Sequence, residues 1–160
     1  MPTHPLIARH LDQRKVPYRV RHHRPAYSAQ AVAEREHVSG VRFGKVVVAV
    51  ADGRPVLFVM PAYDHLDEVL ARDALGAREL HLAGELEAAR FLPGIEIGTA
   101  PPLRLWPGVD LWMEKTMEHE GPIVFQGGTH ADAIEMDFAD WRRVADPQVA
   151  RVVRPTFVGA

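Results

Sequence analysis

The stretch VRFGKVVVAVA, residues 41–51, decides the fold, because it is the most strand-like run in the chain. Its apolar residues are β-branched and continuous rather than alternating, which is typical of a strand covered on both faces. A charged residue, Lys45, stands near the start of this run. Burying an ammonium group costs free energy unless the group is paired or faces a polar cleft. Lys45 is therefore either a strand-end lysine that reaches water or a functional cation.

The choice between Arg and Lys along the chain supports a specific role for Lys45. The chain contains sixteen Arg and only three Lys, so it uses Arg wherever either cation would serve. A lysine at this position indicates a need for a compact, rotatable ammonium group rather than a planar guanidinium fork.

The charge is unevenly distributed along the chain. Residues 1–54 carry a balance of +6 with five His, and residues 55–160 carry −8, which gives the net charge of −2. The basic half could meet a polyanion, or the two halves could interleave in the fold and cancel. The absence of Cys excludes disulfides and thiolate catalysis. We see no signal-peptide core and no apolar run of membrane length, and we therefore expect a cytoplasmic protein without a membrane partner.

Turn and cap residues around the strand predict its neighbours. Asp52-Gly53 predicts a tight hairpin to a second strand over 55–60. Helical spacing predicts helices over 3–14 (capped by Thr3), 28–37, 64–75 (ending at Gly76), 84–91 and 138–144. Further strands are expected over 16–22, 109–113, 123–126 and 131–136, and residues 79–82 are either a short strand or a turn. These elements predict a single α+β domain over residues 1–160, with a mixed, largely antiparallel curved sheet flanked by helices.

Common catalytic motifs are missing from the sequence. There is no G-x-S-x-G elbow, and the nine His show no compact ligand spacing, so neither a metal site nor a cofactor is expected. Two glycine-containing segments remain as candidates. Gly98–Pro102 is either a ligand loop with free Thr99 and Ala100 amides or a proline-rich connection. Gly127–His130 is either a hairpin turn or the edge of a site. His23 and Tyr27 flank Pro25 in a loop that could also carry function.

The order of these segments is similar to that of the YbaK/ProX family of aminoacyl-tRNA deacylases, which resemble the editing domain inserted in bacterial prolyl-tRNA synthetase. The resemblance rests on residues 23–30, 44–48, 56–62, 75–77, 94–102 and 124–130, within a core of about residues 14–145. It implies a free-standing trans-editing hydrolase without a cofactor, which cleaves the ester of mischarged aminoacyl-tRNA. The partners would be the acceptor end of the tRNA and, in addition, an aminoacyl-tRNA synthetase.

The resemblance also implies roles for single residues. Lys45 would hold the acceptor end, and the Gly98–Pro102 loop would position the aminoacyl group through backbone amides while a bound water attacks the ester. The catalytic set implied in this way is Lys45, Gly98, Thr99, Ala100 and Pro102. The substrate-binding set is His23, Tyr27, Phe43, Val47, Met60, Gln126, Gly127, Gly128 and His130.

Two other functions stay open. The family commonly has an Asn at the place of Gln126 and Asp-Glu-Ser-Leu where this chain has Glu114-Lys115-Thr116-Met117. These departures favour a non-catalytic module of the same fold that binds a tRNA end or a synthetase. The third function is a metal-dependent hydrolase that uses the histidines.

Overall fold

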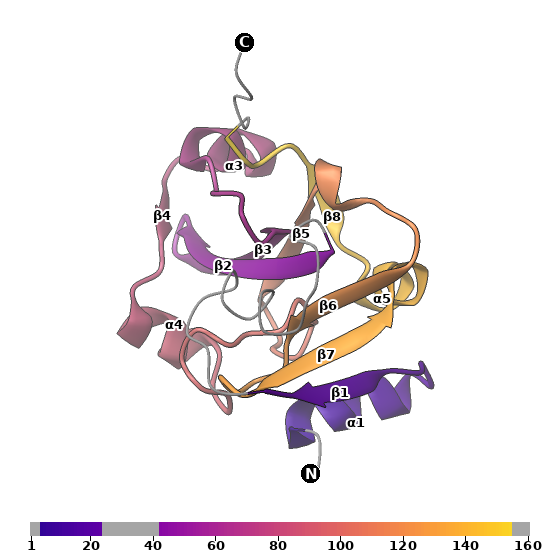
Figure 1. Cartoon of the computed structure of the whole chain (residues 1–160). Helices are drawn as coiled ribbons and strands as arrows, with labels where there is room; N and C mark the ends of the chain where they lie inside the picture. Colours follow the sequence, from indigo (N-terminus) through magenta and orange to yellow (C-terminus); the bar gives the residue numbers. More distant parts are fainter. Residues whose placement is uncertain (1–3, 24–41, 155–160) are drawn as a thin grey trace.

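The predicted hairpin lies at the centre of the computed structural model, which describes residues 4–23 and 42–154 (Figure 1). Strands β2 (Phe43–Ala51) and β3 (Arg54–Pro61) pair in antiparallel fashion along their length. The two turn residues both have positive φ angles, 49° at Asp52 and 82° at Gly53. This is type I′ geometry, which matches the twist of the flanking strands. The hairpin predicted from Asp52-Gly53 is confirmed.

The other described strands join β2 and β3 in one mixed sheet. They are β1 (Arg19–His22), β4 (Leu80–Leu82), β5 (Asp110–Glu114), β6 (Pro122–Gln126), β7 (Asp132–Asp137) and β8 (Gln148–Ala150). The order is β1-β7-β6-β2-β3-β5-β8, and β4 pairs with β2 off this path. The pairs β1–β7, β6–β7, β2–β3 and β2–β4 are antiparallel, whereas β2–β6, β3–β5 and β5–β8 are parallel. The expected α+β fold with a mixed sheet is confirmed.

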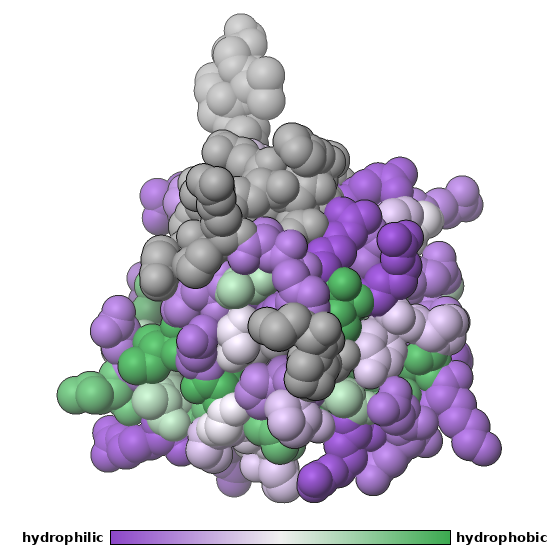
Figure 2. All heavy atoms as spheres, turned by 60° about the horizontal axis from the view of Figure 1, so that its bottom comes forward, coloured by the Kyte–Doolittle hydropathy of each residue, from purple (hydrophilic) through white to green (hydrophobic). Residues whose placement is uncertain are grey.

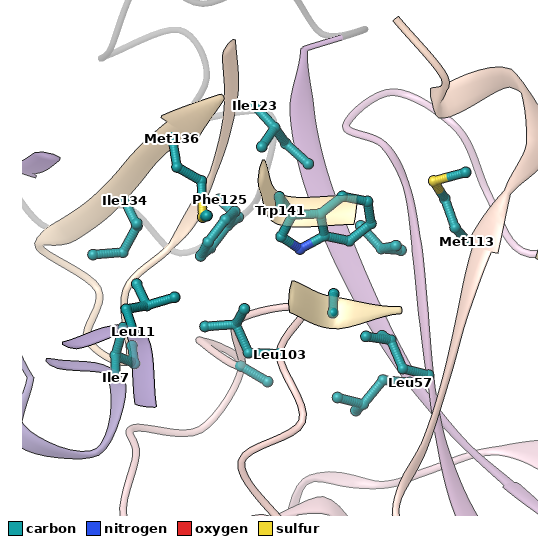
Figure 3. Packing of buried hydrophobic residues seen from close by; sticks show 14 of the residues in the cluster. Ile7, Leu11, Leu57, Leu103, Met113, Ile123, Phe125, Ile134, Met136 and Trp141 are labelled. Carbon is teal, nitrogen blue, oxygen red and sulfur yellow. The ribbon is translucent and has the colours of Figure 1, made fainter. Parts of the chain in front are cut away.

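Helices cover both faces of the sheet. They are α1 (Pro5–Gln13), α3 (Glu68–Leu75), α4 (Glu85–Phe91) and α5 (Phe138–Ala145), with a 3-10 turn η1 (Lys115–Met117). The larger core lies under α1, α5 and the segment 92–109 (Figure 3). The smaller core lies on the other face, under α3 and residues 152–153. No helix in the described part of the chain is both long and apolar enough to cross a bilayer.

Helix ends follow local chemistry. Helix α3 stops at Gly76, as predicted, because its φ of 66° is left-handed. Helix α1 is capped by His4, whose Nδ1 accepts a hydrogen bond from the Leu6 N–H at 3.3 Å. Thr3, the expected cap, and the expected helix over 28–37 lie outside the described residues.

Strand β2 is incompletely paired on the edge that faces away from β3. It pairs with β6 at Phe43 and Gly44, and with β4 from residue 49 to residue 51. Among the described strands, none pairs with residues 45–48 on this edge. The described strands therefore leave a gap in the sheet beside Lys45.

Candidate functional site

Lys45 lies in β2 opposite Met60 of β3 and is half-buried. Its Nζ donates a hydrogen bond to the main-chain carbonyl of Asp64. Burial lowers the pKa of Lys45, and the charge of Asp64 offsets part of this effect. A partly desolvated ammonium attracts an anion more strongly than a surface lysine does, because the local dielectric constant is lower.

The segment 93–102 is held at both ends by tryptophan side chains. The indole N–H of Trp106 donates to the Pro93 carbonyl at 3.0 Å, and that of Trp141 donates to the Pro102 carbonyl at 2.9 Å. Trp141 is fully buried and packs in the larger core (Figure 3). The loop predicted from Gly98–Pro102 is thus fixed to the close-packed interior of the molecule.

Within this loop, one predicted amide is engaged and the other is not. Gly98 has a φ of 81°, a conformation that strains residues with a side chain. Thr99 is fully buried, and both its N–H (3.3 Å) and its hydroxyl (2.6 Å) donate to the Glu96 carbonyl. The expectation that the Thr99 amide is free was wrong, because this amide closes the turn. The Ala100 N–H makes no hydrogen bond to another described residue.

The segment Gly127–His130 packs directly against this loop. Gly128 donates its N–H to the Thr99 carbonyl at 3.1 Å and accepts from the Glu96 N–H at 3.0 Å. The His130 N–H donates to Oε1 of Glu96 at 2.7 Å. The segment connects the antiparallel strands β6 and β7, which confirms the predicted turn, and it also supports the loop.

A cavity of about 290 Å³ lies between β2, α4 and the loop. It is lined by residues 46–48 of β2, by Leu82, Ala83, Glu85, Ala88, Ala89 and Leu92, and by residues 95–98 and Ala100 of the loop. Its described walls are mainly apolar, and Glu85 and Glu96 are the only ionisable residues among the described lining residues. Small-molecule sites range upward from roughly 300 Å³. The cavity thus suits a group of the size of one amino acid.

The mouth of the cavity carries exposed apolar side chains. Leu82 and Ile97 are 48% and 46% exposed, and Leu86 of α4 is 81% exposed. Figure 2 shows the side that lies at the bottom of Figure 1, where apolar patches interrupt a mainly hydrophilic surface, one of them at the left, where α4 lies in Figure 1. Apolar surface beside an opening is typical of a ligand-binding face.

The gap in the pairing of β2 opens at this cavity. Main-chain groups of alternate residues point to the same edge of a strand. On this edge, the Arg42 carbonyl accepts from the Val124 N–H (3.0 Å) and the Val48 carbonyl accepts from the Ala83 N–H (2.9 Å). Val46 lies between Arg42 and Val48 in the same phase, so its N–H and C=O face the gap. A ligand in the cavity would meet a main-chain donor and acceptor as well as apolar side chains.

Most of the sequence-predicted loop residues come together around the cavity. Val47, Gly98 and Ala100 line it. Lys45 is not among the lining residues, but it lies two positions before Val47 on the same face of β2. The residues that support the loop behind the cavity are Thr99, Pro102, Gly128 and His130.

Other predicted residues lie away from the cavity wall. Phe43 and Met60 have no exposed surface, so contact with a substrate would require them to move. Gln126 is 7% exposed at the end of β6, and a Cβ on Gly127 would lie 3.3 Å from the main chain of β7. The His23 N–H extends the pairing of β1 by donating a hydrogen bond to the Ala131 carbonyl. Tyr27 lies outside the described residues.

Sequence reasoning missed Glu96 and the helix α4 as parts of the site. The helix was predicted, but its pattern of residues does not say which strand it faces. Ala88 and Ala89 line the cavity only because α4 packs beside the gap in β2. Glu96 offered one signal, since it is a charged residue between Ile95 and Ile97 in a glycine-bounded segment.

Glu114, which departs from the family pattern, is a structural residue. It is fully buried, and its carboxylate accepts hydrogen bonds from the N–H and hydroxyl of Thr116 (2.6 Å each) and from the N–H groups of Val152 (2.8 Å) and Val153 (3.2 Å). Burial raises the pKa of Glu114, but these hydrogen bonds outweigh burial and hold the pKa below its usual value. Glu114 thus ties residues 152–153 to the end of β5.

The described histidines are dispersed rather than clustered. His22 pairs with Asp132, and His81 pairs with Glu87 at 3.1 Å. Within residues 4–23 and 42–154, no three His, Asp or Glu side chains meet in a way that could hold a metal ion.

Comparison with known proteins gives a family match. Residues 23–144 match the aminoacyl-tRNA editing domain family. Among solved structures, the hypothetical protein APE2540 superimposes with a TM-score of 0.84 at 18% identity, covering 93% of this chain and 99% of that chain. A candidate trans-editing enzyme for prolyl-tRNA synthetase gives a TM-score of 0.81 at 20% identity, covering 97% of this chain and 99% of that chain. At these identities the likeness shows the fold alone. No curated protein sequence gives a significant match.

Proposed function

Because the chain belongs to the aminoacyl-tRNA editing domain family, we propose that it is a trans-editing hydrolase, an aminoacyl-tRNA deacylase that cleaves the ester of mischarged tRNA. The observation that carries this proposal is an apolar cavity whose lining residue Val47 lies two positions after the half-buried Lys45, on the same face of β2. The partner is the acceptor end of the tRNA, and a synthetase could work alongside. The proposal includes a cytoplasmic location, where charged tRNA is used.

The two ends of the site suit the two ends of the substrate. The aminoacyl side chain enters the cavity between β2 and α4, where the walls are apolar. The Lys45 ammonium binds phosphate or ribose oxygens of the terminal nucleotide, because a compact cation that burial has partly desolvated attracts these oxygens strongly. The exposed Leu82 and Ile97 at the mouth offer an apolar surface to the terminal adenine base.

Hydrolysis needs little more than positioning, because an aminoacyl ester is already activated. No Ser, Cys or Thr is among the described residues that line the cavity, and the attacking group in this proposal is a water molecule. Its oxygen forms a bond to the ester carbon, and the N–H groups of Val46 and Ala100 stabilise the negative charge that develops on the carbonyl oxygen. The ester C–O bond then breaks. The ribose oxygen takes a proton, and the products are a free amino acid and an uncharged tRNA.

An editing role fits a cavity of this kind. A synthetase discriminates poorly between amino acids that differ by a methylene group, since such a difference is worth only about 1–3 kcal/mol. A second site that admits the wrong side chain and hydrolyses its ester restores accuracy. The cavity volume would set the largest side chain that is removed.

The test is a panel of tRNAs charged with different amino acids and incubated with the purified full chain. We expect hydrolysis above the buffer rate for one or a few amino acids with small or aliphatic side chains. Absence of turnover on every member of the panel would refute the proposal. Tight tRNA binding without turnover would instead support the non-catalytic alternative.

A further inference from the structure

Among the described residues that line it, the cavity has negative charge and no positive charge. These residues include Glu85 and Glu96 but no Lys, Arg or His. Such a site attracts a ligand that combines an apolar body with a cationic group. In an aminoacyl ester with an aliphatic side chain, the only cationic group is the α-ammonium.

Glu96 is held in place more firmly than an exposed carboxylate usually is. Its main chain bonds to Gly128 and Thr99, and its Oε1 accepts from the His130 N–H at 2.7 Å. Its second carboxylate oxygen, Oε2, makes no hydrogen bond to another described residue. Glu96 lines the cavity, and the hydrogen bond to His130 restricts its side chain, so little side-chain entropy is left to lose on binding.

The gap in β2 supplies a second acceptor. The Val46 carbonyl faces the same cavity, on the edge of β2 where no described strand pairs with it. An ammonium group has three N–H donors and needs several acceptors when it leaves water. A carboxylate and a main-chain carbonyl meet this need, and the carboxylate also compensates the charge.

We propose, on the basis of the proposed function, that this cavity selects its substrate by the free α-ammonium group. The Glu96 carboxylate and the Val46 carbonyl bind this group together. Glu96 is then a specificity-determining residue of the deacylase. The aminoacyl group lies in the gap as a single strand residue would, with its nitrogen toward the Val46 C=O and its ester carbonyl toward the Val46 N–H.

The proposal has a consequence for substrate choice. N-acylation removes the positive charge and leaves one N–H donor in place of three. The acyl group also occupies space beside Glu96. tRNA esters with a blocked amine, such as formylmethionyl-tRNA and peptidyl-tRNA, are therefore excluded, although their ester bond is the same.

The experiment compares one aminoacyl-tRNA, the best substrate of the panel, with its N-acetylated form. We expect the wild type to hydrolyse the free-amine form at least about 100-fold faster in kcat/KM, since two charge-assisted hydrogen bonds are lost on acetylation. Glu96→Gln should reduce this preference about tenfold by slowing only the free-amine form. Glu87→Gln serves as the control, because Glu87 lies on α4, pairs with His81 and does not line the cavity. It should leave the preference unchanged.

Two kinetic results would overturn the inference: equal rates of the wild type on both forms, or an equal loss on both forms in Glu96→Gln. If the wild type hydrolyses no tRNA ester, the proposed function fails. The inference about the α-ammonium group is then tested separately, by measuring how a substrate analogue binds. The probe is then adenosine that carries an amino acid with a small aliphatic side chain as a 3′-amide, with its amine either free or acetylated, and its binding is measured by NMR titration. Tighter binding of the free amine, lost in Glu96→Gln, supports the inference, and equal binding contradicts it.

Discussion

The clamp on the loop can be tested by replacing Trp141 with Phe. This change removes the indole N–H that donates to the Pro102 carbonyl at 2.9 Å and leaves that buried carbonyl without a partner. An unpaired buried acceptor costs about 1–3 kcal/mol. The space left by the smaller ring adds roughly 1 kcal/mol in a close-packed core. We therefore expect the free energy of unfolding to fall by about 2–4 kcal/mol in total.

Trp112→Phe is the matched control for this prediction. Trp112 is half-buried, and its indole N–H has no partner among the described residues. The same ring change there breaks no hydrogen bond and should cost less than about 1 kcal/mol. Urea unfolding followed by circular dichroism measures both variants, and in the thermal transition Trp141→Phe should melt roughly 5–15 °C lower than the wild type. Equal destabilisation of the two variants would refute the clamp.

Three further predictions concern acid stability and the loop. His10 is buried, and burial first, then the charge of Arg14, lowers its pKa to about 4. His10 binds a proton more readily in the unfolded chain than in the folded one. Its full contribution to the free energy of unfolding is therefore present above pH ~6.5, and about 2 kcal/mol of it should be lost on going to pH 5. His10→Leu should flatten that part of the stability–pH curve, whereas an unchanged slope would rule His10 out as its cause. Glu114→Gln replaces the acceptor of four hydrogen bonds and should lower the unfolding free energy by about 2–4 kcal/mol in urea titrations at neutral pH; a loss below half a kcal/mol would contradict its structural role. Gly98→Ala places a side chain at φ 81° and should cost roughly 1–2 kcal/mol with slower deacylation, so an unaffected variant would argue against the left-handed turn.

Local features of the sequence predicted local structure well. The Asp52-Gly53 turn, the stop at Gly76 and the helices at 84–91 and 138–144 all depend on neighbouring residues, and the structure confirms each of them within a few positions. Pairings between distant segments were not predictable in this way. The parallel contact of β2 with β6 brings Phe43 beside Val124, and no turn residue encodes such a contact.

The same distinction applies to the site. The glycine-containing loops were recognised from their composition, because backbone shape there depends on Gly and Pro. The cavity was not, since it exists only where β4 and β6 leave a gap along β2 and α4 covers it. The role of Glu114 was equally hidden, because its partners at residues 152–153 come from the far end of the chain.

The measurement that tests the central claim most directly is the single-turnover rate of ester hydrolysis for wild type and Lys45→Ala on the best aminoacyl-tRNA of the panel. Lys115→Ala is the control, since Lys115 lies in η1 and is exposed, whereas Lys45 lies in β2 and is half-buried. Loss of a charge-assisted contact to the terminal nucleotide should slow Lys45→Ala by at least about tenfold, while Lys115→Ala keeps the wild-type rate. A rate for Lys45→Ala equal to that of the wild type would contradict the account.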